Sequence, residues 1–128
     1  MNSLGRHRRQ RAFTLVEVMI IVALIGLLAV LTVPGFIKNR ERSQGNRTIS
    51  DARIIDAAIN EWALETGQTD GSPIDLISAA SYTKLGVINT NDVLGNAYVI
   101  GTVGATQVLI STATKSALVN ANLDWGAY

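Results

Sequence analysis

The chain of 128 residues contains no cysteine and a single histidine, His7. Without cysteine no disulfide can form, so the folded part must be stabilised by a packed core, by oligomerisation or by a bound ion. Zinc sites and nucleophile–base pairs built on cysteine or histidine are therefore excluded from the chain beyond His7. Nothing in the sequence is low in complexity, and it contains no internal repeat.

Acidic residues are absent from residues 1–12, which carry four arginines: Arg6, Arg8, Arg9 and Arg11. All ten acids and the other seven bases lie beyond this segment. The formal charge of +1 therefore becomes 7 − 10 = −3 if residues 1–12 are removed. Nucleic acid is not expected as a partner, because phosphate binding requires clustered lysine and arginine.

Charge of either sign is also absent from Val18 to Ile37. As a helix, these twenty positions span about 30 Å, the thickness of the hydrocarbon core of a bilayer. We therefore predict a membrane helix over Phe13 to Ile37. The apolar run is too long for a conventional secretory signal, and no good small-residue cleavage site follows it, so any cut should fall before the apolar block.

Two residues in this helix require explanation. Glu17 is an acid at the start of an apolar helix, where a carboxylate is costly and usually partnered, unless it lies among the lipid headgroups. Pro34 has no amide hydrogen, so the carbonyl of Val30 loses its helical partner. We predict a kink or local opening between Val30 and Gly35, with helix exit from the membrane as the alternative.

The run RAFTLVE at residues 11–17, followed by an uninterrupted apolar helix with Gly26 and Pro34, resembles the class III leader of type IV pilins and type II secretion pseudopilins. The resemblance implies that a prepilin peptidase cuts between Ala12 and Phe13 and that the new amino group of Phe13 is methylated. It also implies that Phe13, Glu17, Gly26 and Pro34 act in assembly. The family usually has glycine before the cut, so Ala12 is expected to slow processing.

A physical argument supports the assembly role of Glu17. A buried carboxylate is stabilised by a cation a few ångströms away, and cleavage creates a new α-amine that can act as this cation. The resemblance implies that the amine belongs to Phe13 of a neighbouring subunit.

Residues beyond the apolar block are predicted to continue the helix as far as Thr66, where Gly67 stops it. A three- and four-residue spacing places five apolar residues on one face. These are Ala52, Ile55, Ile59, Trp62 and Ala63. The resemblance implies an α+β fold: a pilin-like lollipop whose long N-terminal helix, half membrane and half amphipathic, packs on a small antiparallel β-sheet.

Shorter elements are predicted for the remainder of the chain. Ser72 and Pro73 indicate a short helix over Pro73 to Ala80. A hairpin is predicted from Ala97 to Val103 and Gln107 to Thr112, with Val99 and Val108 to Ile110 packed on the amphipathic face of the long helix. Thr114 to Ala121 is either a third strand or a return segment.

The segment from Asp92 to Tyr98, DVLGNAY, resembles the Asp-x-x-Gly-Asn-Pro-Tyr segment of major pseudopilins, with Ala97 in place of proline. This resemblance favours the secretion branch over the pilus branch. It also raises calcium as a possible cofactor, for which Asp92 and Asp124 are the available loop acids. The acids of the long helix, Asp56, Glu61 and Glu65, are interpreted as a solvated face, so we do not expect an enzyme.

The chain is thus divided into a cleaved leader (1–12), a transmembrane and assembly helix (13–37) and a small head (38–128). The resemblance implies a structural subunit of a type II secretion pseudopilus, with itself, a prepilin peptidase, other pseudopilins and an inner-membrane assembly platform as partners. It would cross the bacterial inner membrane once, with its head in the periplasm, and join a periplasm-spanning filament. The numbers of bases on the two sides of the span do not favour either orientation.

Two alternatives remain open at this point. The first is the pilin of a type IV pilus used for adhesion, motility or DNA uptake. The second is an uncleaved, membrane-anchored periplasmic binding domain, which would retain Arg6 to Arg11 in the mature chain.

Overall fold

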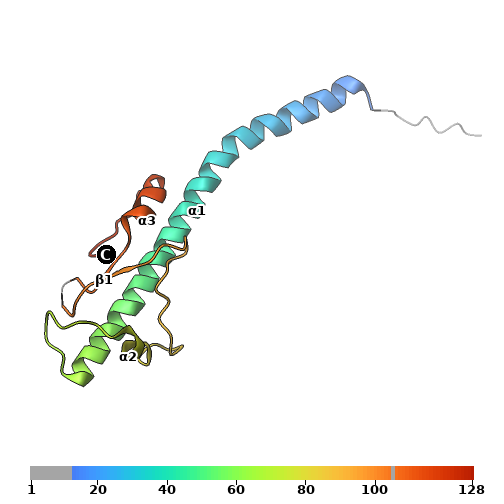
Figure 1. Ribbon diagram of the computed structural model, residues 1–128. Helices are drawn as coiled ribbons and strands as arrows, with labels where there is room; N and C mark the ends of the chain where they lie inside the picture. The colour runs from blue at the N-terminus through green and yellow to red at the C-terminus, as the bar shows by residue number, and fades with distance from the viewer. Residues whose placement is uncertain (1–12, 105) are drawn as a thin grey trace, which may run out of the picture. The chain divides into compact units, whose positions relative to one another are not determined.

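The computed structural model describes residues 13–104 and 106–128, so Ala12 and the rest of the predicted leader lie outside the described residues. The helices are α1 (Leu15–Thr66), α2 (Leu76–Ala80), α3 (Thr112–Ala117) and a 3₁₀ turn, η1 (Val119–Ala121). The strands are β1 (Val99–Ile100) and β2 (Val108–Leu109) (Figure 1). The chain divides into two units, Met1–Phe36 and Ile37–Tyr128, which are described separately.

The described part of the first unit is the apolar portion of α1. The most apolar stretch of 18 residues has a mean hydropathy of 2.8, and none of it is buried. By length and composition this helix can cross a membrane. The predicted local opening near Pro34 is wrong, because α1 is continuous through it. Proline removes a single amide donor and leaves the neighbouring turns of the helix bonded. A kink between Val30 and Gly35 stays a prediction.

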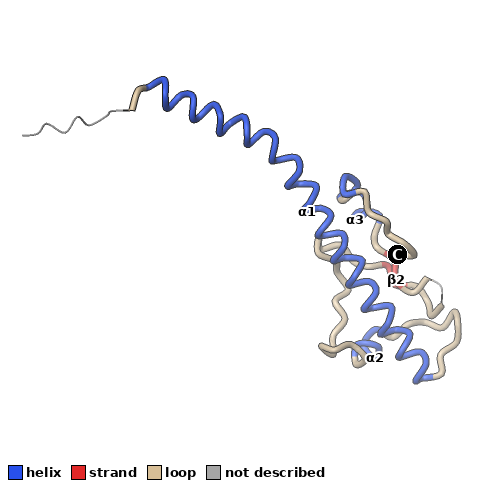
Figure 2. The backbone as a smooth tube through the Cα atoms, turned by 180° about the vertical axis from the view of Figure 1, so that it is seen from behind, coloured by secondary structure: helices blue, strands red, loops and turns tan. Residues whose placement is uncertain are grey.

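The second unit is built on the remainder of α1, along which the short elements fold back (Figures 1 and 2). The predicted amphipathic face is confirmed: Ile59 is fully buried, and Trp62 is 6% exposed. The partners of this face come from the hairpin and from α2. The buried cluster consists of Ile49, Ala52, Ile55, Ile59, Trp62, Ala63, Ala79, Tyr98, Val103, Val108 and Ile110.

Both ends of this core are fixed by glycines. Gly67 has a φ of 67°, and the amide of Gln68 donates to the carbonyl of Ala63 over 2.8 Å, which is the Schellman ending of α1. At the other end Gly45 is buried, and a Cβ there would collide with Cδ1 of Leu123. Gly45 therefore allows the last residues of the chain to lie directly against α1.

The two strands are antiparallel, with Val99 opposite Leu109 and Ile100 opposite Val108. This confirms the α+β class, with a long helix packed on a small antiparallel sheet. The strands are shorter than predicted. Val108 and Ile110 pack in the core as expected, but the prediction for Val99 is wrong, because it is 53% exposed.

Two predicted elements are corrected. The short helix begins at Leu76 instead of Pro73, because Asp75 is its N-cap and accepts the amides of Ile77 and Ser78. Hydrogen bonding to Ser78 also lowers the pKa of Asp75. Pro73 instead forms an isolated bridge with Thr102.

The segment from Thr114 to Ala121 contains most of α3 and all of η1, and is not a third strand. Ser111 caps α3 by accepting the amide of Thr114, and this cap starts a helix in place of a third strand.

Tyr98 joins the hairpin to α1. Its hydroxyl donates to the carbonyl of Thr48 over 3.2 Å, and its side chain is 6% exposed. Burial, with smaller contributions from the negative charges of Asp51 and Asp92, raises the pKa of Tyr98 to about 12.

This pKa predicts a loss of stability at alkaline pH. An unfolded tyrosine ionises near pH 10, so above about pH 10 the unfolded chain releases a proton that the folded chain retains. The stabilisation is complete below pH 10 and is lost as the pH rises towards about 12. Urea denaturation across this range should show the decline, and Tyr98→Phe should flatten it. An unchanged slope in Tyr98→Phe would assign the decline to other groups.

Candidate assembly site

The start of α1 is held by a reciprocal pair of hydrogen bonds. The amide of Glu17 donates to Oγ1 of Thr14 over 3.3 Å, and the amide of Thr14 donates to Oε2 of Glu17 over 3.4 Å. This arrangement is a capping box, which satisfies amides that have no partner within the helix. The Thr-x-x-Glu spacing of residues 14–17 is the sequence signal for this capping box, whereas the prediction for Glu17 rested on its charge alone.

The capping box places the carboxylate of Glu17 at the beginning of its own helix. Phe13, one residue before Thr14, is 74% exposed. Of the four residues for which an assembly role is predicted, Phe13 and Glu17 thus lie on either side of the first turn of α1, and Gly26 and Pro34 lie further along the helix. The cut itself lies between Ala12 and Phe13, at the edge of the described residues, and stays a prediction.

The apolar surface from Phe13 to Ile37 is exposed throughout. At Gly26 a Cβ would meet nothing within 4 Å, so no contact among the described residues requires glycine there. Pro34 is likewise exposed within α1. An apolar surface of this extent requires lipid or other helices to cover it, and close helix packing is a setting in which small residues such as glycine are favoured.

Asp92 organises the segment that resembles major pseudopilins. Its Oδ1 accepts the amides of Leu94 and Asn96, both over 2.9 Å, and its Oδ2 accepts the hydroxyl of Thr114. Gly95 has a φ of 86°, which favours glycine. The Asp-x-x-Gly-Asn pattern is thus explained by a turn that fixes the hairpin to the start of α3.

The same contacts bear on the calcium prediction. Both carboxylate oxygens of Asp92 already accept hydrogen bonds, whereas Asp124 is exposed and accepts the amide of Gly126. Among residues 13–104 and 106–128, no group of three or more acidic, histidine or cysteine side chains is positioned to hold a metal ion. Calcium binding stays a prediction.

Two acids of α1 that were interpreted as a solvated face accept hydrogen bonds from tyrosines. Glu65 accepts the hydroxyl of Tyr82 over 2.6 Å, and Asp56 accepts that of Tyr128 over 3.4 Å. The bond to Glu65 raises the pKa of Tyr82. No sequence pattern predicts these pairs, because they join residues far apart in the chain.

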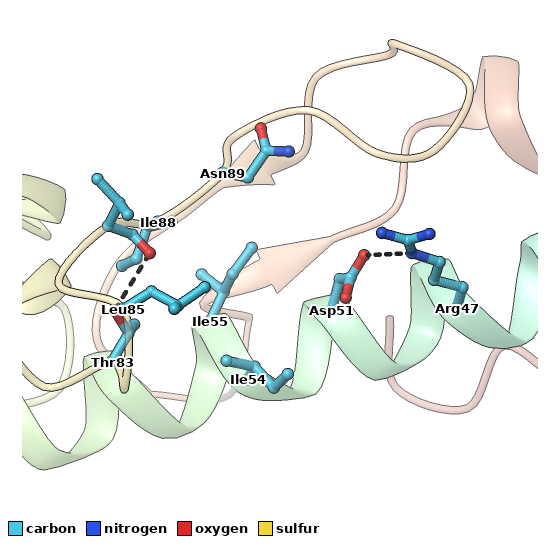
Figure 3. A pocket seen from close by; sticks show the side chains of 9 residues that line it. Arg47, Asp51, Ile54, Ile55, Thr83, Leu85, Ile88 and Asn89 are labelled. Atoms are coloured by element: carbon cyan, nitrogen blue, oxygen red, sulfur yellow. Dashed lines mark hydrogen bonds and ion pairs between the residues drawn. The ribbon is translucent and has the colours of Figure 1, made fainter.

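A shallow groove of about 250 Å³ lies between α1 and the loop after α2 (Figure 3). Arg47 and Asp51 pair at one end of it, with 3.9 Å between Nε and Oδ2. The remaining lining is mainly apolar and includes Leu85, which is 84% exposed. The lining residues are Arg47, Asp51, Ile54, Ile55, Thr83, Leu85, Val87, Ile88 and Asn89. Because its one acid and one base are paired together, the groove does not present a catalytic constellation.

Comparisons with known proteins agree with this geometry. Residues 7–33 match the prokaryotic N-terminal methylation motif. The type II secretion system core protein G of Escherichia coli is 33% identical over 104 residues, which cover 72% of each chain. The Klebsiella pneumoniae protein of the same name is 32% identical over 77 residues, or 58% of this chain and 55% of that protein. No solved structure shows a significant match.

The long helix, the small antiparallel sheet and the methylation motif define a type IV pilin-like protein. Within this class, the chain belongs to the family of the type II secretion system core protein G. The apolar helix and this membership fit a single-pass anchor in the inner membrane.

Asp92 provides a test of the turn. Asp92→Ala should destabilise the protein by about 2–4 kcal/mol, because two amides and one hydroxyl lose a charged acceptor. Asp92→Asn retains one oxygen for the two amides and should cost less. Urea denaturation of the full chain in detergent measures both effects. Two variants as stable as the original would show that the turn does not depend on this carboxylate.

Proposed function

We propose that this protein is a structural subunit of a type II secretion pseudopilus and that it polymerises through its N-terminal helix to drive protein export. The observation that carries the proposal is the similarity to the Escherichia coli core protein G over 72% of both chains. The uncovered apolar helix supports it, because a filament core of packed helices would cover that surface. The protein itself has no catalytic role in this proposal.

In the proposed assembly, a prepilin peptidase cuts between Ala12 and Phe13, and the amino group of Phe13 is methylated. The carboxylate of Glu17 then pairs with the Phe13 amine of a neighbouring subunit. Its hydrogen bond to Thr14 is 3.4 Å long, near the upper limit for such bonds, so the carboxylate remains available to a cation. Burial among apolar helices would make the pair difficult to separate.

The location and the other partners follow from this role. The head lies in the periplasm, and the filament spans that compartment. Other pseudopilins join the filament, and an inner-membrane platform assembles it. The support for these statements is the family membership.

A type IV pilus pilin is the second candidate. The type IV major pilin protein PilA of Myxococcus xanthus is 43% identical over 47 residues, but these cover only 37% of this chain and 21% of that protein. A match confined to so short a stretch does not distinguish the two kinds of filament. The Escherichia coli match extends over 104 residues and favours the secretion branch.

Intact mass spectrometry of the native protein tests the proposal. We expect a mass that lacks residues 1–12 and carries one additional methyl group, recovered with the washed membranes. The same mass abundant in sheared surface material would favour the surface pilus. An uncut mass in both fractions would overturn the proposal in favour of a membrane-anchored binding domain that retains Arg6 to Arg11.

The capping box allows the charge of Glu17 to be tested separately from its hydrogen bond. Glu17→Gln preserves a side-chain acceptor for the amide of Thr14 but removes the charge. Both Glu17→Gln and Glu17→Ala should be processed, and both should lower filament levels about tenfold or more, because a buried ion pair is broken. Filament levels are measured by chemical cross-linking of subunits in the washed membranes, followed by immunoblotting. Normal assembly of Glu17→Gln would contradict the proposed pairing.

A further inference from the structure

The bases of the chain beyond the leader are concentrated next to the apolar span. Residues 38–47 hold four bases and one acid, a net charge of 4 − 1 = +3. Residues 48–128 hold three bases and eight acids, a net charge of 3 − 8 = −5. The head (38–128) therefore begins with a short basic segment and is acidic beyond it.

Three of these bases, Lys38, Arg40 and Arg42, are exposed, and we call them the basic collar. None of the three forms an ion pair with an acid among residues 13–104 and 106–128. The fourth base, Arg47, differs because it is paired with Asp51. The one acid of the segment, Glu41, has Oε2 buried without a hydrogen-bond partner among the described residues. The exposed surface of the segment is thus positive.

The collar lies around the helix and does not form a patch on one side of it. At about 100° per residue, Lys38 and Arg42 are separated by about 40°, whereas Arg40 lies on the opposite side of α1. A docked protein contacts one side of a helix, but the headgroups of a bilayer surround it. The distribution of the charges therefore favours a lipid layer over the acidic head of another subunit.

The depth of the collar also fits a lipid layer. Lys38 directly follows the uncharged run that ends at Ile37. The rise from Lys38 to Arg42 is about 6 Å, comparable to the headgroup layer on one side of a bilayer. The first fully buried residue of α1 is Gly45, so the three exposed collar bases precede the buried core.

We propose that Lys38, Arg40 and Arg42 bind the phosphate groups of anionic lipids in the leaflet on the head side of the membrane. Guanidinium groups donate to phosphate oxygens in a fixed geometry, and long basic side chains reach headgroups from the end of an apolar helix. The proposal requires only that α1 spans the membrane. It does not depend on cleavage or polymerisation. Lipid binding can therefore be absent while the proposed function holds, and it can be present while the proposed function fails.

The test uses the full chain reconstituted in phosphatidylcholine vesicles with traces of spin-labelled lipid. Electron paramagnetic resonance measures how much of the labelled phosphatidylglycerol, compared with labelled phosphatidylcholine, is immobilised by the protein. We expect the protein to prefer labelled phosphatidylglycerol over labelled phosphatidylcholine about fivefold. This is the effect of one base on one anionic headgroup. The preference should decline with added salt.

Two variants that each lose three positive charges provide the comparison. Lys38→Gln/Arg40→Gln/Arg42→Gln should lower the preference, and the part that remains is due to the four arginines of residues 1–12, which the full chain retains before the span. The control, Arg47→Gln/Arg53→Gln/Lys84→Gln, should retain it, because these bases lie beyond the collar. The proposal is overturned by an absence of preference in the unmodified chain, by a preference that is undiminished in the collar variant, or by an equal loss in both variants. Cross-linking between subunits that is lost only in the collar variant, without a lipid preference, would identify the acidic head of another copy as the partner.

Discussion

The structure depends on the cost of exposing the first half of α1 to water. The residues from Phe13 to Ile37 are apolar on every side and are exposed in the described chain. Buried apolar area contributes roughly 25 cal/mol per Å², so a helix of this kind is stable only within a membrane or among other helices. The carboxylate of Glu17 at the start of this apolar helix and the basic collar after its end mark the limits of the part that lipid or other helices must cover.

The second half of α1 differs from the first because only one of its faces is apolar and buried. It has a single apolar face, and the short elements of residues 67–128 need only cover that face. Very little regular structure is required for this purpose: two strands of two residues each, two short helices and one 3₁₀ turn among the described residues. Side-chain hydrogen bonds replace regular structure, as at Asp75, Ser111 and Asp92.

Periodicity and charge predicted the long helix, its buried face and its end at Gly67, because these features depend on neighbours three or four residues apart. The start of α2 and the helical character of α3 were not predicted, since they depend on which side chain caps which amide. The exposure of Val99 and the pairs of Glu65 with Tyr82 and of Asp56 with Tyr128 depend on contacts between distant residues. At the assembly site, the sequence indicated Phe13 and Glu17 but not the hydrogen bonds between Thr14 and Glu17.

The close approach of Leu123 to Gly45 has a consequence for the order in which the protein folds. These two residues are separated by 123 − 45 = 78 positions, and the hydroxyl of the last residue, Tyr128, reaches Asp56. Contacts of such long range cannot form until the residues around Leu123 have been synthesised. The turn of α1 around Gly45 therefore stays uncovered on this side while the preceding residues are made, and Leu123 completes the packing there.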